Sequence, residues 1–202
     1  MSRSKHFPPR RPKSVRGIRS QEVRAAKSRV EWAKKWSAAL ERMDFCGRLG
    51  RGRNYAMSGQ VTELRAEADG TVVAKVQGAR PQPYEVSLDF RKPQGAARKR
   101  IVAAIRREPM LTARLLAGEM PMEVEEIFRA EGFDLYPGGK LDAVRRRTDA
   151  GRLYDTVMAC GCPDYANPCK HVFAALVLLG EEAARRPTLL LELRGVKMEE
   201  LI

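Results

Sequence analysis

The sequence has no hydrophobic run long enough to cross a membrane and no signal-peptide pattern. Its longest apolar run extends from Val172 to Leu179, whereas a membrane-spanning helix needs about 20 apolar residues. The first thirty residues are basic and contain no apolar core of the kind that signal peptides carry. We therefore expect a soluble, cytoplasmic protein with reduced thiols. Clustered cysteines in such a protein are metal ligands or catalytic groups rather than disulfides.

The motifs of common enzyme sites are also missing. The sequence contains no paired carboxylates in a motif context, no phosphate-binding loop and no spare histidine near a nucleophile. The glycine and prolines of GARPQP (Gly78–Pro83) separate two strand-like runs and do not form a phosphate-binding loop. The sequence therefore predicts that the protein is not an enzyme.

Positive charge is abundant but unevenly distributed. Residues 1–54 contain 16 Lys and Arg against 4 Asp and Glu, a net charge of +12, whereas the remainder of the chain carries +1. Such asymmetry suggests a polyanionic partner, most often nucleic acid. The alternative is a solvated tail that only aids solubility. If the protein binds DNA or RNA, the residues expected to contact it are Arg10, Arg11, Lys13, Arg16, Arg19, Arg48, Arg51 and Arg53.

The N-terminal half is predicted to contain a disordered arm followed by a folded body. Residues 1–19 are basic, proline-rich and poor in apolar residues, which is typical of a disordered extension. The body is expected over residues 20–131. Apolar residues at three- and four-residue steps predict a helix over residues 21–43, and the glycines of GRLGRGRNYAMSG (Gly47–Gly59) break it.

The rest of the body alternates between strand-like and helix-like patterns. Three valine-rich, alternating runs at residues 60–65, 71–77 and 84–90 predict a small antiparallel meander. Helical spacing returns in residues 96–131, where three short helices are expected. Residues 132–151 have turn chemistry without a clear period and are interpreted as a linker or long loop.

The sequence after this linker carries the most specific chemical signal. Three of the four cysteines and one of the two histidines fall within twelve residues, namely Cys160, Cys162, Cys169 and His171. Gly161 permits the local bend that lets the two cysteines beside it converge. Cys169 must precede a helix and His171 must lie at its start, because residues two apart within a helix point about 200° apart.

This spacing predicts a structural zinc site. Four ligands make a closed tetrahedral site, whereas catalytic zinc keeps one position open. The alternatives are a chance cluster around a core histidine and a dithiol redox pair, although redox pairs usually place two residues between their cysteines. Cys46 and His6 lie far upstream, and we expect Cys46 to be neither a ligand nor a disulfide partner.

The sequence therefore predicts an α+β fold. It consists of a three-strand antiparallel meander with flanking helices, followed by a zinc-stabilised strand–loop–helix module over residues 152–202. Within the module, a strand ends in the cysteine cluster and a helix spans about residues 170–184. Two short helices are expected at residues 188–193 and 197–201.

The pattern C-x-C…C-x-H followed by an apolar helix resembles the SWIM zinc finger. The blocks WAKKWSAALERM, GRGRNYAMSGQV, VQGARPQPYEV and CGCPDYANPCKHV, in this order, resemble stand-alone bacterial SWIM proteins over roughly residues 30–202. The resemblance implies that Cys160, Cys162, Cys169 and His171 are the zinc ligands. It also implies nucleic-acid or protein partners, and stand-alone members are often found with Swi/Snf-type helicases.

Two functions follow from these observations. The first is a non-enzymatic, zinc-binding adaptor that binds DNA or RNA with little sequence specificity. The second is a protein-interaction module whose zinc finger docks a helicase or a ribonucleoprotein. A nucleic-acid binder should place Lys and Arg beside exposed aromatic side chains, whereas a protein adaptor should expose an apolar patch.

Overall fold

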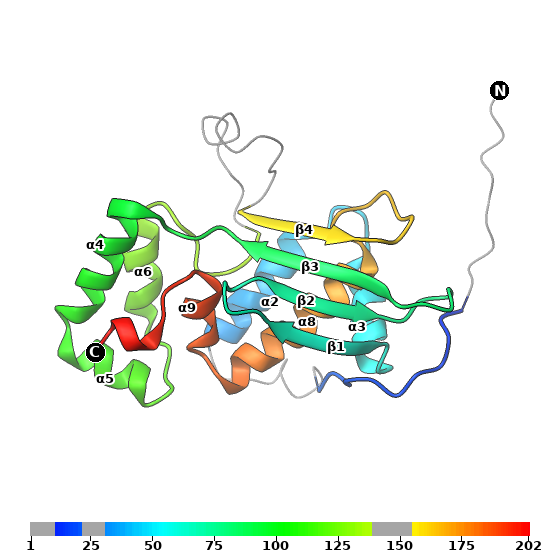
Figure 1. The fold of residues 1–202 in the computed structure, drawn as a ribbon, viewed down its shortest axis with the longest axis horizontal. Helices are drawn as coiled ribbons and strands as arrows, with labels where there is room; N and C mark the ends of the chain where they lie inside the picture. Colours follow the sequence, from blue (N-terminus) through cyan, green and yellow to red (C-terminus); the bar gives the residue numbers. More distant parts are fainter. Residues whose placement is uncertain (1–10, 22–30, 139–154) are drawn as a thin grey trace, which may run out of the picture.

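The computed structural model describes residues 11–21, 31–138 and 155–202, and they form an α+β fold around one antiparallel sheet (Figure 1). The sheet has the strand order β1-β2-β3-β4. Its strands are β1 (Val61–Ala66), β2 (Val72–Val76), β3 (Tyr84–Phe90) and β4 (Thr156–Cys160). None of the helices in this described part of the chain combines the length and the hydrophobicity needed to span a bilayer.

The predicted meander is present, because alternating side chains give β2 and β3 one buried face. The tight turn between β1 and β2 contains Gly70 at a φ of +82°, and the Asp69 carboxylate accepts the backbone N–H of Thr71 at 2.8 Å. β2 and β3 pair in antiparallel register, with Ala74 opposite Val86. The side chains of both residues are buried, as expected for a sheet with one face on the core.

The sheet has four strands rather than the predicted three. β4, which was assigned to a separate C-terminal module, pairs with β3 so that Val86 faces Cys160 and Leu88 faces Met158. The sequence pattern of β3 identifies it as a strand but does not show which strand pairs with its second edge. The predicted module is therefore built into the sheet through β4.

One layer of helices covers a single face of the sheet (Figure 1). It consists of α2 (Glu31–Met43), α3 (Leu49–Met57) and α8 (Lys170–Arg185). The apolar α8 contacts all four strands as well as α2 and α3, and its residues from His171 to Leu179 are all buried. The predicted helix over residues 21–43 is described from Glu31 onward, and residues 22–30 lie outside the described part.

Helix α3 occupies the segment in which glycines were predicted to break the helix. Gly47, at a φ of +62°, does separate α2 from α3, but Gly50 and Gly52 are helical. Gly52 is required by packing, since a Cβ there would lie 2.4 Å from the Cβ of Phe173 in α8. Glycine lowers helix propensity, yet it permits this close approach of two helices.

The three short helices predicted within residues 96–131 lie together at one end of the sheet (Figure 1). They are α4 (Gly95–Arg106), α5 (Pro109–Leu116) and α6 (Met122–Ala130), and α9 (Leu189–Leu193) and the 3₁₀ helix η1 (Met198–Glu200) lie near them. Pro109 is the first residue of α5 and Pro121 precedes α6, as proline's fixed φ favours. Of the predicted loop 132–151, residues 139–151 lie outside the described part.

Residues 11–21, here called the basic strap, run beside the outer edge of β1 (Figure 1). Ile18 forms a bridge with Val61, and the backbone N–H of Lys13 donates to the carbonyl of Gly78 at 3.0 Å. This arrangement differs from the disordered arm predicted for residues 1–19, of which residues 1–10 lie outside the described part. Edge strands offer unpaired backbone groups, which accounts for the contact.

The end of the strap is fixed to α8 through a carboxylate. The Ser20 hydroxyl and the backbone N–H of Gln21 donate to Glu181, at 2.5 and 2.9 Å respectively. Removing the strap would therefore uncover the edge of β1 and leave the buried Glu181 without these donors.

A buried ion pair joins the C-terminal region to the beginning of β4. Arg194 is 0% exposed, and its guanidinium lies 2.7 Å from the carboxylate of Asp155. It also donates to the carbonyls of Arg91 and Tyr136, at 3.0 and 2.8 Å. Burial raises the pKa of Asp155, and the charge of Arg194 opposes this rise. The pair links segments that are far apart in the sequence.

We predict that Arg194→Met destabilises the fold by about 3–5 kcal/mol, because it leaves the Asp155 carboxylate buried without its cation. The matched control is Arg185→Met, which removes an exposed pair with Glu182 and should change stability by about 0.5 kcal/mol or less. Urea unfolding of both variants checks the difference. Similar losses in the two variants would contradict the assigned role of the buried pair.

Candidate metal centre

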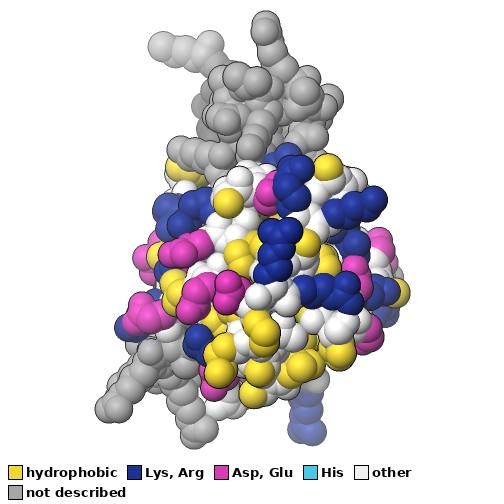
Figure 2. Space-filling view, turned by 90° about the vertical axis from the view of Figure 1, so that its left-hand side faces the viewer, with side chains coloured by type: hydrophobic (Ala, Val, Ile, Leu, Met, Phe, Trp, Pro, Cys, Tyr) yellow, Lys and Arg dark blue, Asp and Glu magenta, His cyan; other side chains and the backbone are white. Residues whose placement is uncertain are grey.

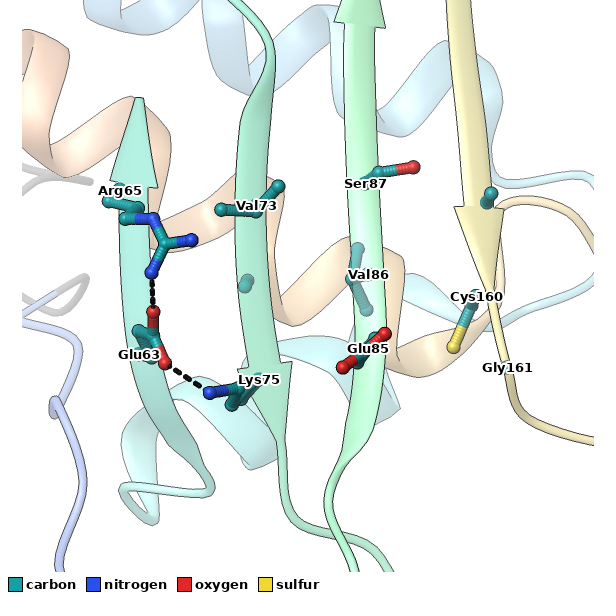
Figure 3. Close-up of a pocket in the computed structure, with 11 residues that line it drawn as sticks. Glu63, Arg65, Val73, Lys75, Glu85, Val86, Ser87, Cys160 and Gly161 are labelled. Atoms are coloured by element: carbon teal, nitrogen blue, oxygen red, sulfur yellow. Dashed lines mark hydrogen bonds and ion pairs between the residues drawn. The ribbon is translucent and has the colours of Figure 1, made fainter. Parts of the chain in front are cut away.

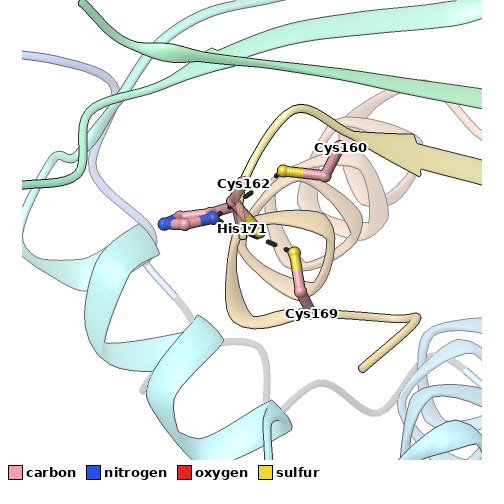
Figure 4. Close-up of side chains that lie close together, drawn as sticks. All are labelled: Cys160, Cys162, Cys169 and His171. Carbon is pink, nitrogen blue, oxygen red and sulfur yellow. Dashed lines mark hydrogen bonds between the residues drawn. The ribbon is translucent and has the colours of Figure 1, made fainter. Parts of the chain in front are cut away.

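The four predicted ligands converge where β4 meets α8 (Figure 4). Cys160 is the last residue of β4, and Cys162 follows in the turn after it. Cys169 is the N-cap of α8, and His171 lies in the first turn of that helix, as the spacing predicted. The three sulfurs and one imidazole nitrogen all lie within 4.8 Å of one another.

The donor atoms fit a single metal ion. The Nδ1 atom of His171 lies 3.7 Å from Sγ of Cys160 and 3.8 Å from Sγ of Cys169. Tetrahedral ligands with metal–sulfur bonds of about 2.3 Å stand roughly 3.5–3.8 Å apart. Three thiolates and an imidazole suit a soft or borderline divalent cation rather than magnesium or calcium. The site is therefore compatible with metal binding.

Backbone contacts hold the two halves of the centre in place. The N–H of Gly161 donates to the carbonyl of Glu85 at 3.1 Å, which extends the pairing of β4 with β3 past its last residue. The side-chain amide of Asn167 donates to the carbonyl of Met158 at 2.8 Å, and the Cys169 carbonyl accepts the N–H of Phe173 at 3.0 Å. The sheet thus positions the first two cysteines and the helix positions the remaining ligands.

The ring of His171 is enclosed by two tyrosines that sequence reasoning missed. His171 is 2% exposed, with ring centroids of Tyr55 and Tyr84 at 5.2 and 4.6 Å. Its Nε2 atom is buried without a hydrogen-bond partner in the described residues, on the side where a Cβ on Gly78 would lie 3.5 Å away. Aromatic packing therefore fixes the ring with Nδ1 facing the sulfurs.

The loop between the second and third cysteines is tied to α3. The Arg48 guanidinium donates to both carboxylate oxygens of Asp164, at 3.0 and 3.2 Å, and to the carbonyl of Cys46 at 3.1 Å. Both charged side chains of the pair are largely buried. Arg48, which was predicted to contact nucleic acid, is thus engaged within the fold.

The cysteines differ in their affinity for protons. A hydrogen bond from Cys160 and, to a smaller extent, one from His171 lower the pKa of Cys169 to about 4, against the effect of burial. The same interaction with Cys169, together with burial, raises the pKa of Cys160, and burial raises that of Cys162. Because metal ligation requires thiolates, binding of an ion would release protons from this cluster.

The other predicted nucleic-acid contacts lie mostly on the strap. Arg11, Lys13, Arg16 and Arg19 are exposed and make no ion pair with another described residue, whereas Arg10 lies outside the described part. On α3, Arg51 is exposed without such a pair. Arg53 instead lies 3.5 Å from the carboxylate of Glu41.

A shallow depression on the uncovered face of the sheet holds a different group of residues (Figure 3). Glu63 pairs there with Arg65 and, at 2.8 Å, with Lys75. The hydrogen bond from Lys75 lowers the pKa of Glu63. Val73 and Ser87 lie side by side in the hollow. The depression therefore carries the Glu63 carboxylate, which is paired with two cations, and the exposed Glu85 of β3 beside it.

We predict that Cys162→Ser abolishes metal binding and lowers the free energy of unfolding by more than about 4 kcal/mol, as loss of a structural metal does. Cys162 is half-buried, so the substitution removes little packing. Because β4 pairs with β3, the loss should reach the whole sheet. Elemental analysis and urea unfolding test this prediction, and chelation of the unaltered protein should give the same loss. An unchanged stability after chelation would contradict it.

We predict that Cys46→Ser leaves the metal content unchanged, because Cys46 is exposed in the turn between α2 and α3 and the centre already has four ligands. The variant is measured beside Cys162→Ser by elemental analysis. Loss of one metal equivalent on substitution of Cys46 would show that the ligand set is wrong.

Comparison with known proteins identifies one relative that aligns with the whole chain. The uncharacterized protein Rv2102 of Mycobacterium tuberculosis (strain ATCC 25618 / H37Rv) is 36% identical over 206 residues, an alignment that covers 100% of this chain and 68% of the relative. No family model matches the sequence, and no solved structure matches it. By this identity over its full length, the chain belongs to the same protein family as the mycobacterial protein.

Proposed function

We propose that the protein is a zinc-binding protein of the SWIM type and that it acts as a nucleic-acid-binding adaptor without catalytic activity. The zinc assignment is supported by the ligand set of Cys160, Cys162, Cys169 and His171, whose donor atoms gather within 4.8 Å. Sulfur-rich, four-ligand sites at a strand–loop–helix junction are typical of structural zinc. The C-x-C…C-x-H order on this junction supports the SWIM assignment.

The ion would act on folding rather than on a substrate. When bound, it would supply four bonds that join the end of β4 to the start of α8. All four donors come from the chain, so no position is left for a water molecule or a substrate to bind the ion. The residues around it are therefore interpreted as a scaffold.

The observation that carries the nucleic-acid proposal is the distribution of cations without ion-pair partners. Among the described residues, those near the metal centre and along the strap are Arg11, Lys13, Arg16, Arg19, Arg51, Arg80 and Lys170. Phosphates are bound by such cations, because a cation already held by a carboxylate contributes little further attraction.

Ring contacts link two of these cations to the tyrosines that pack on His171. Lys170 Nζ lies 5.8 Å from the ring centroid of Tyr55, and the Arg80 guanidinium lies 5.6 Å from that of Tyr84. Both tyrosine rings contact His171. The strap reaches the same region, since Lys13 is hydrogen-bonded to Gly78. The unpaired cations thus surround the zinc site from several elements.

The opposite end of the molecule provides the contrast. There, basic and acidic side chains appear together on the surface (Figure 2). Several are ion-paired at 2.6–3.0 Å, namely Arg98 with Glu200, Arg100 with Glu131 and Arg114 with Glu119. A polyanion would have to compete with these carboxylates, so we place the phosphate-binding surface at the metal-bearing end.

A second candidate function is a protein-interaction module, and it is favoured by apolar side chains at the end opposite the metal centre. Met110 and Leu116 of α5, Met122 of α6 and the C-terminal Ile202 are exposed, and hydrophobic side chains show on the corresponding face (Figure 2). On sequence grounds we expect a Swi/Snf-type helicase or a ribonucleoprotein to dock on the zinc finger, whereas these exposed side chains favour a contact at the opposite end. Such a contact would depend on apolar burial and only weakly on salt.

We predict that the double variant Lys13→Gln/Arg16→Gln weakens binding to mixed-sequence DNA or RNA. It should also reduce the steepness of the plot of log association constant against log salt concentration by about 2, because each lost phosphate contact removes about 0.9 from that slope. These substitutions leave the backbone hydrogen bonds of the strap intact. Fluorescence anisotropy between 50 and 200 mM salt measures the slope.

The matched control is Lys99→Gln/Arg107→Gln, which removes two exposed cations of α4 and its C-terminus that also lack ion pairs in the described residues. We expect its slope to equal that of the unaltered protein. If both double variants shift the slope equally, the attraction is nonspecific. If the unaltered protein does not bind nucleic acid at all, the nucleic-acid proposal fails and the protein-interaction alternative is favoured.

A further inference from the structure

Tyr165 is the most exposed large hydrophobic side chain of the described residues, at 86%. It lies in the middle of the loop that connects Cys162 with Cys169, so both ends of its loop are anchored by predicted metal ligands. A single exposed hydrophobic residue is ordinary on a protein surface. The surroundings of Tyr165 are what distinguish it.

The backbone beside Tyr165 is held rigidly. The preceding residue, Asp164, forms the two-armed ion pair with Arg48 and accepts the backbone N–H of the following residue, Ala166, at 3.2 Å. Ala166 itself is buried. The loop therefore presents the tyrosine ring to solvent from a fixed base, which reduces the entropy lost when a partner stacks on it.

Cations flank the exposed ring. The guanidinium of Arg48 lies 5.7 Å from its centroid, and Arg51 is one turn further along α3. Lys170 begins α8 directly after the last cysteine, and its Nζ atom lies 5.8 Å from the ring centroid of Tyr55. A second aromatic side chain, Phe45, is 62% exposed. It lies in the turn between α2 and α3, where the carbonyl of Cys46 accepts a hydrogen bond from the Arg48 guanidinium.

We infer that Tyr165 is a stacking platform for an unpaired base of single-stranded nucleic acid, with Arg51 and Lys170 contacting the adjacent phosphates. This inference rests on the proposed nucleic-acid function and adds the strand state of the ligand and the residue that contacts a base. Exposed aromatic rings beside unpaired cations bind single strands, because every base offers a face for stacking and every nucleotide a phosphate. In a duplex, the faces of the bases are already stacked and unavailable to Tyr165.

The charge of the surface favours nucleic acid over a protein partner as the occupant. Arg51 and Lys170, which lack ion pairs in the described residues, would remain without an ion-pair partner beneath an apolar protein surface, which is costly. A phosphate backbone supplies those charges at the spacing of successive nucleotides. A stacked base in turn covers the apolar face of Tyr165.

The test compares Tyr165→Ala with Tyr165→Phe on mixed-sequence oligonucleotides, in single-stranded form and as duplexes of the same length. We expect Tyr165→Ala to weaken single-strand binding about 5- to 150-fold, as the loss of one base–aromatic stack does, and to change duplex binding by less than about 2-fold. Tyr165→Phe keeps the ring and should bind like the unaltered protein. Because no charge is removed, the salt slope should stay the same.

Two controls keep the result interpretable. Met110→Ala removes an exposed hydrophobic side chain at the opposite end of the molecule and should have no effect on binding. Elemental analysis should show that each Tyr165 variant retains its metal, because the ring is not a ligand.

The outcomes separate this inference from the proposed function. If Tyr165→Ala binds single strands normally while Lys13→Gln/Arg16→Gln binds weakly, the stacking site is wrong and the nucleic-acid function stands. If Tyr165→Phe loses as much affinity as Tyr165→Ala, the hydroxyl rather than the ring makes the contact, and the inference fails. If the unaltered protein binds neither single strands nor duplexes, both proposals fall together.

Discussion

The pairing of β4 with β3 is the contact on which the rest of the structure depends. It pairs Cys160 with Val86. The strand register therefore fixes the position of the first candidate ligands relative to the sheet. The chain then turns and enters α8, whose buried residues fill the space beneath all four strands. β4 and α8 thus contribute residues to the core and also position the candidate ligands, which lie where the two elements meet.

Helix α3 links the core to the metal centre in a second way. Its close approach to α8 at Gly52 brings Tyr55 against the imidazole of His171 and Arg48 against Asp164. One of these contacts is with a ligand, and the other is with the loop between ligands. In metal sites, such outer contacts orient the ligands and exclude water. The surroundings of the centre are therefore built from segments distant in sequence.

Sequence predicted the local features of this protein well and the long-range ones poorly. The four ligands lie within twelve residues, so their spacing alone predicted that Cys160 and His171 converge, and the helix N-cap at Cys169 followed from simple geometry. The three alternating runs of the meander were also recognised. The fourth strand was missed as a partner of β3, because alternation identifies a strand without naming its neighbour.

The errors at α3 and at the strap have a common physical cause. Gly52 was interpreted as a helix breaker, but its lack of a side chain serves a contact with Phe173 that is visible only once α8 is placed. The strap is polar and basic, and its order comes from the edge of β1 and from Glu181 rather than from its own residues. In both cases tertiary contacts outweigh a local preference.

The proposed metal ion and the proposed binding surface would be coupled through one loop. The loop that carries Tyr165 contains no helix or strand, so its conformation is set by the ligands at its ends and by the ion pair of Asp164 with Arg48. An ion held by Cys162 and Cys169 would restrict both ends of that loop at once. Without those bonds, the ion pair alone would have to offset the conformational entropy of the loop. The proposed metal ion would therefore set the geometry of the proposed binding surface above it, even with all four of its positions filled by protein ligands.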